Sequence, residues 1–136
     1  MELQVGVKVL LKNGEGKYLL LKRSPVKYPG TKGSWDIVGG RIDPGTTLFE
    51  NLKREIKEEI GLDFNAEPKL IAAQDILRLP GKHVVRLTYV GDLEGEPILD
   101  GEEHSEFRWF TLDELKNFED LDMYTKELLG KGLLDR

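Results

Sequence analysis

Three glutamates in residues 54–61, REIKEEIG, have a spacing that could hold a metal ion. In a helix, residues three and four apart lie side by side, so Glu55, Glu58 and Glu59 would crowd one edge. Like charges at this spacing destabilise a helix by about 0.2–0.5 kcal/mol per pair unless a cation compensates them. Mg²⁺ takes oxygen ligands and binds through carboxylates and substrate phosphates. The spacing therefore indicates a divalent-cation site, with a solvated helix edge as the alternative.

Basic residues gather shortly before this acidic segment. Between residues 17 and 35 the chain has five basic residues and no acidic one. They are Lys17, Lys22, Arg23, Lys27 and Lys32. Cationic side chains bind phosphate oxygens, and a metal ion beside them can neutralise a phosphate and activate a water molecule. Together the two segments indicate metal-assisted hydrolysis of a phosphoanhydride, and ordinary charged surface is the alternative.

The glutamates are expected on a helix that begins after Thr47. Thr47 and Glu50 have the spacing of a capping box, and Gly61 is a natural C-cap. Apolar residues at helical spacing predict the side that packs on the core, and these are Leu48, Phe49, Leu52, Ile56 and Ile60. The glutamates fall at the rim of this apolar stripe and not on the opposite, solvated face.

The elements around this helix predict an α+β fold. Alternating or short apolar runs predict strands over residues 3–11, 17–23, 35–38, 69–79, 83–93 and 106–110. A short helix is expected after a second Thr-x-x-Glu cap at Thr111, and a final amphipathic helix over residues 119–134. Residues 24–34 contain two prolines and two glycines, which predicts a long loop. This order mixes antiparallel hairpins with one central helix.

Composition limits the classes of protein that the chain can belong to. Its 136 residues predict a single domain, residues 1–136, and 39% apolar with 33% charged residues is typical of a globular protein. No apolar run approaches the roughly 20 residues of a membrane span. The net charge of −5 argues against a general nucleic-acid binder. The lack of cysteine and an N-terminus unlike a signal peptide favour a cytoplasmic location.

Around the glutamates the sequence resembles the Nudix hydrolases. Their signature reads Gly, five residues, Glu, seven residues, Arg-Glu, an aliphatic residue, any residue, Glu-Glu, any residue, Gly and an aliphatic residue. The chain has Gly40 and matches every fixed position from Arg54 to Leu62. It departs at Thr46, which replaces the first glutamate, and at Val38, where the family often has proline. Outside the signature, the resemblance also covers residues 19–23, Trp35 and residues 108–115.

The resemblance implies an α/β/α sandwich with a mixed central sheet and one catalytic helix. Glu58 and Glu59 match the metal-ligand glutamates, and Glu55 matches a carboxylate that ligates metal, acts as base or does both. Arg54 matches the arginine that orients them, and the carbonyl of Gly39 matches a backbone metal ligand. The implied cofactor is Mg²⁺, with Mn²⁺ as a substitute.

The resemblance also suggests residues that complete the site. Three cations are expected by position to contact phosphate, with ordinary surface as the alternative: Arg23, Lys22 and Arg41. Many family members add a carboxylate from a distant loop, and Glu103 is the expected residue here, with Glu106 second. A base or sugar pocket would draw on scattered residues such as Trp35, Tyr28 and Arg86. His83 and His104 have no partner at metal-site spacing and are expected at the surface or in packing.

The implied reaction is hydrolysis of a nucleoside diphosphate linked to another group, with a small-molecule nucleotide as substrate. The leading prediction is a nucleoside triphosphate pyrophosphatase that releases diphosphate from ordinary or oxidised deoxynucleotides. ADP-ribose cleavage is the alternative within the family, and a nucleotide-binding module without turnover is the alternative outside it. Homodimers are common in the family.

Overall fold

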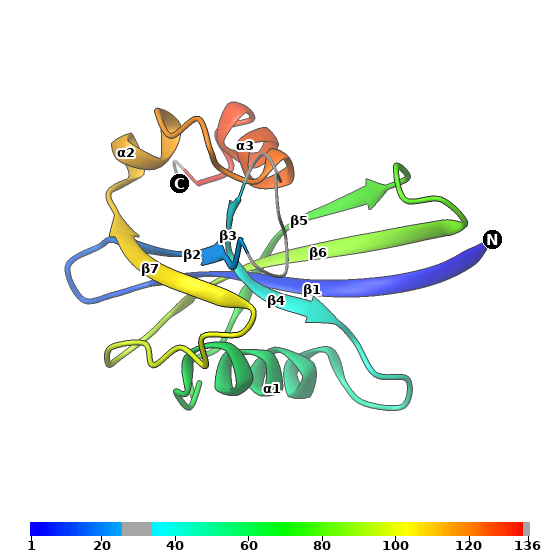
Figure 1. Cartoon of the computed structure of the whole chain (residues 1–136), viewed down its shortest axis with the longest axis horizontal. Helices are drawn as coiled ribbons and strands as arrows, with labels where there is room; N and C mark the ends of the chain where they lie inside the picture. Colours follow the sequence, from blue (N-terminus) through cyan, green and yellow to red (C-terminus); the bar gives the residue numbers. More distant parts are fainter. Residues whose placement is uncertain (26–33, 135–136) are drawn as a thin grey trace.

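The computed structural model describes residues 1–25 and 34–134. Within these ranges seven strands form one mixed sheet, with α1 on one face and α2 and α3 on the other, which confirms the predicted α/β/α sandwich (Figure 1). The elements are β1 Glu2–Lys12, β2 Tyr18–Arg23, β3 Trp35–Asp36, β4 Val38–Arg41, α1 Leu48–Ile60, β5 Lys69–Ile76, β6 Lys82–Asp92, β7 His104–Phe110, α2 Leu112–Lys116 and α3 Met123–Gly130.

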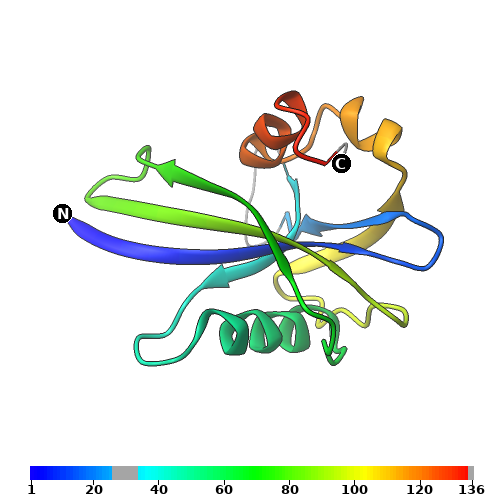
Figure 2. The same ribbon diagram turned by 180° about the vertical axis from the view of Figure 1, so that it is seen from behind.

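The sheet is built around β1, which pairs along its whole length with the parallel strand β6. Its other edge is shared by two antiparallel strands: β4 pairs with residues 6–9 and β2 with Lys12. β5 continues the sheet beyond β6, and β7 and β3 both pair with β2 (Figure 2).

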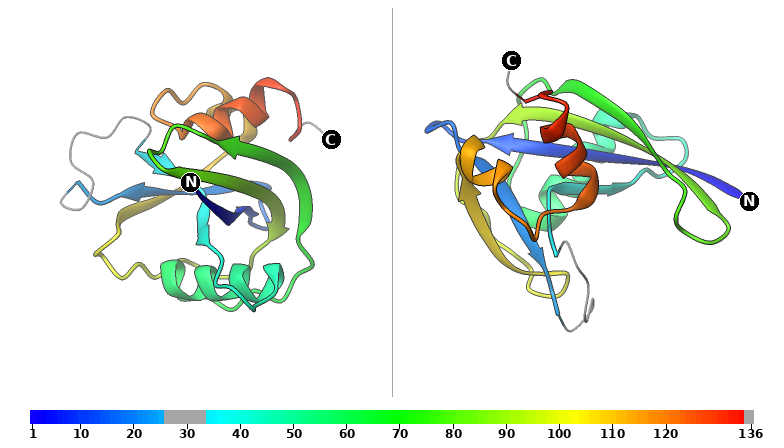
Figure 3. Two further views of the ribbon diagram at one scale, coloured as in Figure 1. Left: turned by 90° about the vertical axis from the view of Figure 1, so that its right-hand side faces the viewer. Right: turned by 90° about the horizontal axis from the view of Figure 1, so that it is seen from above.

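Alternation along the central strands sends side chains into two separate cores. On the α1 side, the core includes Val7, Val9, Leu11, Leu19 and Leu21, packed on Leu52, Ile56 and Ile60. On the other side, the core includes Leu10, Leu20, Trp35, Phe110 and Leu115. The view from above in Figure 3 shows α3 lying across this second face. The two cores hold α1 and α3 in fixed positions on opposite sides of the same strands.

The predicted helix α1 is confirmed at both ends. Thr47 Oγ1 accepts a hydrogen bond from the Glu50 amide at 3.1 Å, and Gly61 closes the helix with φ of 70°. Leu52, Ile56 and Ile60 are fully buried as expected. The same expectation was wrong for Leu48 and Phe49, which are 39% and 40% exposed. Both lie in the first turn, before the buried part of the helix begins at Asn51, so helical spacing alone overestimated the length of the core-facing stripe.

The third strand and the last helix differ from the prediction. The run 35–38 divides into β3 and β4, and the glycine pair lies inside β4. The last helix begins at Met123 and not at residue 119, because residues 120–122 are extended along β3. The Trp35 amide donates to the Asp120 carbonyl at 3.1 Å, and the Asp122 amide donates to the Trp35 carbonyl at 2.8 Å. In the described residues no helix has the length and apolar character of a membrane span.

Candidate active site

The glycine pair of β4 lies directly against the glutamates of α1. The amide of Gly39 donates to Glu59 Oε2 at 2.8 Å. A Cβ atom on Gly39 would lie 2.0 Å from the Val7 carbonyl oxygen, and φ of +143° there also favours glycine. A Cβ atom on Gly40 would lie 2.8–2.9 Å from the carboxylate of Glu55. Gly39 therefore allows β4 to lie close to β1, and Gly40 allows the backbone of β4 to approach the carboxylate of Glu55.

Glu59 is the most deeply buried of the three glutamates. Its side chain is 8% exposed, and burial raises the pKa of Glu59 to about 8, although the charge of Lys8 opposes this shift. His104 Nε2 on β7 lies 3.6 Å from Glu59 Oε1. Burial, followed by the nearby charge of Lys8, lowers the pKa of His104. Burial disfavours the ionised form of Glu59, and a bound cation would stabilise that form. This environment fits a metal ligand.

Arg54 supplies the positive charge that the glutamate spacing requires. Its Nη1 atom lies 2.9 Å from Glu55 Oε1 and 3.3 Å from Glu58 Oε2, and its Nε atom lies 3.4 Å from Asp43 Oδ2. Burial raises the pKa of Glu55 and Arg54 opposes the shift, while the Glu58 side chain stays 59% exposed. Arg54 therefore holds two of the three carboxylates in place.

Asn51 and Thr46 fix the turn that leads into α1. Asn51 Oδ1 accepts from the Asp43 amide at 2.9 Å and from Arg54 Nη2 at 3.0 Å. Its Nδ2 atom donates to Thr46 Oγ1 at 2.7 Å and to the Thr47 carbonyl at 2.6 Å. Thr46, the departure from the family signature, thus supports the turn through Asn51. Sequence reasoning missed Asn51, whose only signal is its position three residues before Arg54.

The oxygen donors of α1 and β4 fit a hard divalent cation such as Mg²⁺. Two of the carboxylates, Glu55 and Glu59, are largely buried beside a backbone that lacks side chains at Gly39 and Gly40. Across residues 1–25 and 34–134, no three His, Cys, Asp or Glu side chains already converge on one point. Glu55 and Glu58 face Arg54, while Glu59 faces the Gly39 amide and His104.

A pocket of about 290 Å³ on the α3 side of the sheet reaches this site at Gly40. Part of its wall is apolar, formed by Ile76, Leu79, Val84 and Tyr124. The rest is charged, formed by Lys8, Arg23, Asp36, Arg41, Arg78, Arg86 and Asp122. The pocket therefore suits a ligand that has both an apolar part and an anionic part.

A buried carboxylate, Asp36, organises the charged part of the pocket. Its Oδ2 atom lies 2.8 Å from Arg23 Nη2 and 3.1 Å from Lys8 Nζ, and its Oδ1 atom accepts from the Ile37 amide at 2.7 Å. Arg86 Nη2 lies 3.6 Å from Asp36 Oδ1 and 3.0 Å from Asp122 Oδ2. Burial would raise the pKa of Asp36, but Lys8, Arg86 and Arg23 hold it well below its usual range. Sequence reasoning missed Asp36, which has no motif around it.

The structure brings some of the expected phosphate contacts together and separates others. Arg23 and Arg41 both line the pocket, and Arg41 also donates to the Gln4 side chain. Lys22 does not line it. Lys22 lies on the face of β2 opposite the α1 core, and its Nζ atom is 3.4 Å from Glu106 Oε2 on β7. Lys22 and Glu106, the second candidate for the added carboxylate, therefore face each other.

The remaining expected residues have the following positions. Glu103 is half-buried directly before His104, and its carbonyl accepts from the Ser24 amide at 2.8 Å. Arg86 lines the pocket, and Trp35 packs against Phe110 and Phe118 in the second core, which agrees with the packing role expected for Trp35. His83 pairs with Asp75 at 2.7 Å. Three expectations, Lys27, Tyr28 and Lys32, lie outside the described residues.

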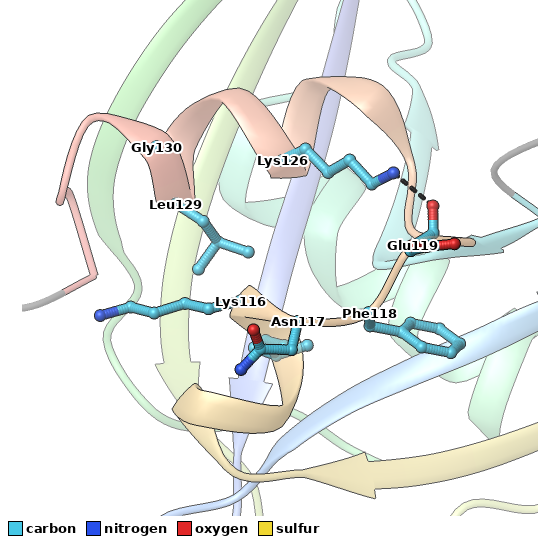
Figure 4. A pocket seen from close by; sticks show the side chains of 8 residues that line it. Lys116, Asn117, Phe118, Glu119, Lys126, Leu129 and Gly130 are labelled. Atoms are coloured by element: carbon cyan, nitrogen blue, oxygen red, sulfur yellow. Dashed lines mark hydrogen bonds between the residues drawn. The ribbon is translucent and has the colours of Figure 1, made fainter.

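A second hollow, of about 570 Å³, lies between α2 and α3 (Figure 4). Its lining comprises Leu115, Lys116, Asn117, Phe118, Glu119, Lys126, Leu129 and Gly130. Lys126 donates to the carbonyl of Glu119 across its rim. Although it is larger than the pocket beside Gly40, its lining contains a single carboxylate, Glu119, and no residue of β4 or α1. The active-site candidate is therefore the pocket beside Gly40.

The fold and the position of the α1 glutamates beside the glycine pair of β4 can be compared with known protein families. A family model described as NUDIX domain matches residues 2–129. The chain belongs to the Nudix family.

Similar proteins are named for several different activities. One is a NAD-capped RNA hydrolase NudC of Stutzerimonas stutzeri, 34% identical over 101 residues, which are 74% of this chain and 34% of that protein. Another is an ADP-ribose pyrophosphatase of Methanocaldococcus jannaschii, 32% identical over 101 residues, 74% of this chain and 58% of that protein. The chain thus spans about a third and somewhat more than half of these two relatives.

Solved structures agree with the fold over almost the whole chain. A MutT protein from Methanosarcina mazei Go1 has a TM-score of 0.80 and 26% identity, covering 95% of this chain and 91% of that one. A MutT NUDIX hydrolase from Burkholderia pseudomallei has a TM-score of 0.77 and 28% identity, covering 96% and 98%.

Proposed function

We propose that the protein is a Mg²⁺-dependent hydrolase that cleaves a phosphoanhydride bond in a nucleoside diphosphate derivative. The observation that carries this proposal is the burial of Glu55 and Glu59 against the side-chain-free backbone of Gly39 and Gly40. Buried carboxylates of this kind need a cation, and the adjoining pocket is lined by further cations suited to phosphates.

In this proposal each group of the site has a role. Glu55, Glu58, Glu59 and the Gly39 carbonyl hold Mg²⁺, or Mn²⁺ in its place. When bound, the cation neutralises phosphate charge and lowers the pKa of a water molecule. Arg54 keeps Glu55 and Glu58 oriented.

Other residues of the chain bind the substrate phosphates and accept the proton of the attacking water. Arg23 and Arg41 bind phosphate oxygens from the pocket side. Water attacks phosphorus, the bond from phosphorus to the leaving phosphate oxygen breaks, and the proton of the water passes to Glu55 or Glu103.

The leading substrate class is nucleoside triphosphates, ordinary or oxidised. Two similarities support it. A nucleoside triphosphatase NudI of Klebsiella pneumoniae is 29% identical over 88% of this chain and 91% of its own length. A putative 8-oxo-dGTP diphosphatase of Bacillus subtilis is 32% identical over 83% of this chain and 70% of its own length. ADP-ribose is the second candidate, because the Methanocaldococcus jannaschii relative is named for that activity.

A substrate panel with Mg²⁺ tests the proposal. Deoxynucleoside triphosphates, 8-oxo-dGTP and ADP-ribose are incubated separately, and chromatography identifies the products. Nucleoside monophosphate with diphosphate indicates the triphosphate activity, whereas AMP with ribose phosphate indicates ADP-ribose cleavage. Turnover should stop in EDTA.

Variants of α1 test the metal assignment. Glu58→Gln and Glu59→Gln should each lower kcat by about 10²-fold or more. Glu50→Gln, the same change at an exposed position of the same helix, serves as the matched control and should keep full activity. Turnover that survives both site substitutions contradicts the metal assignment. Binding without turnover on every substrate would favour a nucleotide-binding module.

The proposed location is the cytoplasm, with no nucleic-acid partner. A homodimer stays a prediction that analytical ultracentrifugation of the purified chain can test.

A further inference from the structure

Lys8 is a half-buried cation in the middle of the central strand β1. Its side chain is 19% exposed, and it faces Gly39 across the β1–β4 pairing. The ammonium lies 3.1 Å from Asp36 Oδ2, 3.2 Å from the Ile37 carbonyl and 3.5 Å from the Gly39 carbonyl. A lysine at the centre of a sheet costs free energy unless its charge is used, so its presence needs a reason.

The pocket that Lys8 lines has five cationic side chains, Lys8 included, and two carboxylates, Asp36 and Asp122. In the described part of the chain its one carboxylate partner is Asp36, which it shares with Arg23 at 2.8 Å and Arg86 at 3.6 Å. Arg41 and Arg78 line the same pocket, and neither is paired with a carboxylate of the described residues. An anion entering the pocket would therefore meet a lining in which, among the described residues, cations outnumber carboxylates.

Lys8 also lies where the pocket meets the glutamates of α1. Its ammonium contacts the carbonyl of Gly39, and the amide of the same residue is bonded to Glu59. The next residue, Gly40, lines the pocket, and a Cβ atom on it would lie 2.8 Å from Oε1 of Glu55. A polyphosphate that extends from the pocket toward α1 must pass this position.

We propose that Lys8 is a substrate-binding residue whose ammonium binds a phosphate oxygen between the pocket and the α1 glutamates. This inference rests on the proposed function, because it takes the ligand to be a polyphosphate. Of the three contacts of Lys8, the one with the Gly39 carbonyl is the longest, and the phosphate oxygen takes its place. A lysine suits this exchange because its three donors rotate about a single flexible stem.

Binding of inorganic diphosphate in EDTA tests the proposal without any need for turnover. Isothermal titration calorimetry compares the wild type with Lys8→Met and Lys22→Met. Lys22→Met is the matched control, because it removes the same charge from a residue that pairs with Glu106 outside the pocket. Loss of a charge-assisted hydrogen bond predicts an affinity at least about tenfold weaker in Lys8→Met, and no change beyond about twofold in the control.

A second measurement uses the unmodified protein and remains informative if Lys8→Met does not fold. Lysines are labelled by reductive methylation with and without diphosphate, and mass spectrometry quantifies each site. Diphosphate should protect Lys8 and leave Lys22 unprotected. Equal labelling of Lys8 in both conditions, diphosphate affinity unchanged in Lys8→Met, or no diphosphate binding by the wild type in EDTA would each overturn the proposal.

The outcomes separate this inference from the proposed function. If the wild type hydrolyses no nucleotide but diphosphate binding depends on Lys8, the proposed function fails and the role of Lys8 stands. If nucleotides are hydrolysed and Lys8 is dispensable for diphosphate binding, only the role of Lys8 fails.

Discussion

The amide of Gly39 and the carboxylate of Glu59 form a hydrogen bond of 2.8 Å across 20 positions of the sequence. This contact joins the edge strand β4 to the helix that carries all three site glutamates. Two glycines permit it: a side chain on Gly40 would clash with Glu55 of α1, and one on Gly39 would clash with the backbone of β1.

Replacing Gly39 should therefore destabilise the protein more than replacing a glycine that is needed only for its positive φ. We expect Gly39→Ala to lower the free energy of unfolding by more than about 3 kcal/mol, since the new Cβ atom meets backbone. Gly45 has φ of +89° with nothing near its missing Cβ atom, so Gly45→Ala should cost only about 1–2 kcal/mol. Urea denaturation measures both values, and equal losses would contradict the close approach of β4 and β1.

Glu59 should make the metal-free protein less stable as pH rises. Burial raises its pKa in the folded protein to about 8, from about 4.5 in the unfolded chain. The folded protein thus keeps a proton that the unfolded chain has already lost, and this contribution is complete below pH 4.5 and disappears as pH passes 8. One such group gives a slope of at most about 1.4 kcal/mol per pH unit. Denaturation in EDTA between these limits measures it, and Glu59→Gln should flatten the curve.

Arg54 should affect kcat more than stability. Arg54→Gln leaves Glu55 and Glu58 without their shared cation, so kcat should fall by about 10- to 100-fold. Lys57→Gln removes the same charge from the same helix at a residue that pairs with Asp63, and it should leave kcat unchanged. Steady-state kinetics decides the comparison, and equal effects would show that only the net charge of α1 matters.

Asn51 should contribute to the stability of the turn that leads into α1. Asn51→Ala removes the contacts to Asp43, Thr46 and Arg54, leaving buried polar groups unpaired at a cost of about 1–3 kcal/mol. Asn65→Ala, at an exposed asparagine, is the control. Thermal denaturation compares the stability of the two variants. A loss of stability no larger in Asn51→Ala than in the control would show that Asn51 does not stabilise the turn.

Thr46→Glu should not improve the enzyme. It introduces the glutamate of the family signature but removes the hydroxyl that bonds both Asn51 and the Asp43 carbonyl. We expect a lower melting temperature and no gain in kcat. A gain in kcat would contradict this expectation and show that a glutamate at position 46 contributes to catalysis.

Local signals predicted the helix of the site well. The caps at Thr47 and Gly61, the buried stripe from Leu52 to Ile60 and the charge of Arg54 all lie within one segment, so spacing alone determines how they meet. The family signature added the metal-binding role to the same residues. The capping box at Thr111 was found in the same way.

The pocket could not be predicted in this way, because it depends on pairing between distant strands. Lys8 and Asp36 are 28 residues apart, and Arg86 reaches Asp36 only because β6 lies beside β1. The face on which Lys22 lies follows from its register with Glu106. The late start of α3 follows from the contacts of residues 120–122 with Trp35.

The parallel pairing of β1 with β6 sets a condition on the folding of the chain. It joins Glu2 to Lys82 and Lys12 to Asp92, so the centre of the sheet cannot close until the ribosome has released the chain beyond Asp92. Contacts this distant in sequence raise contact order and slow folding. Before that point α1 has no finished sheet to pack on, and its glutamates remain in water. The site is thus assembled late, after most of the chain has been made.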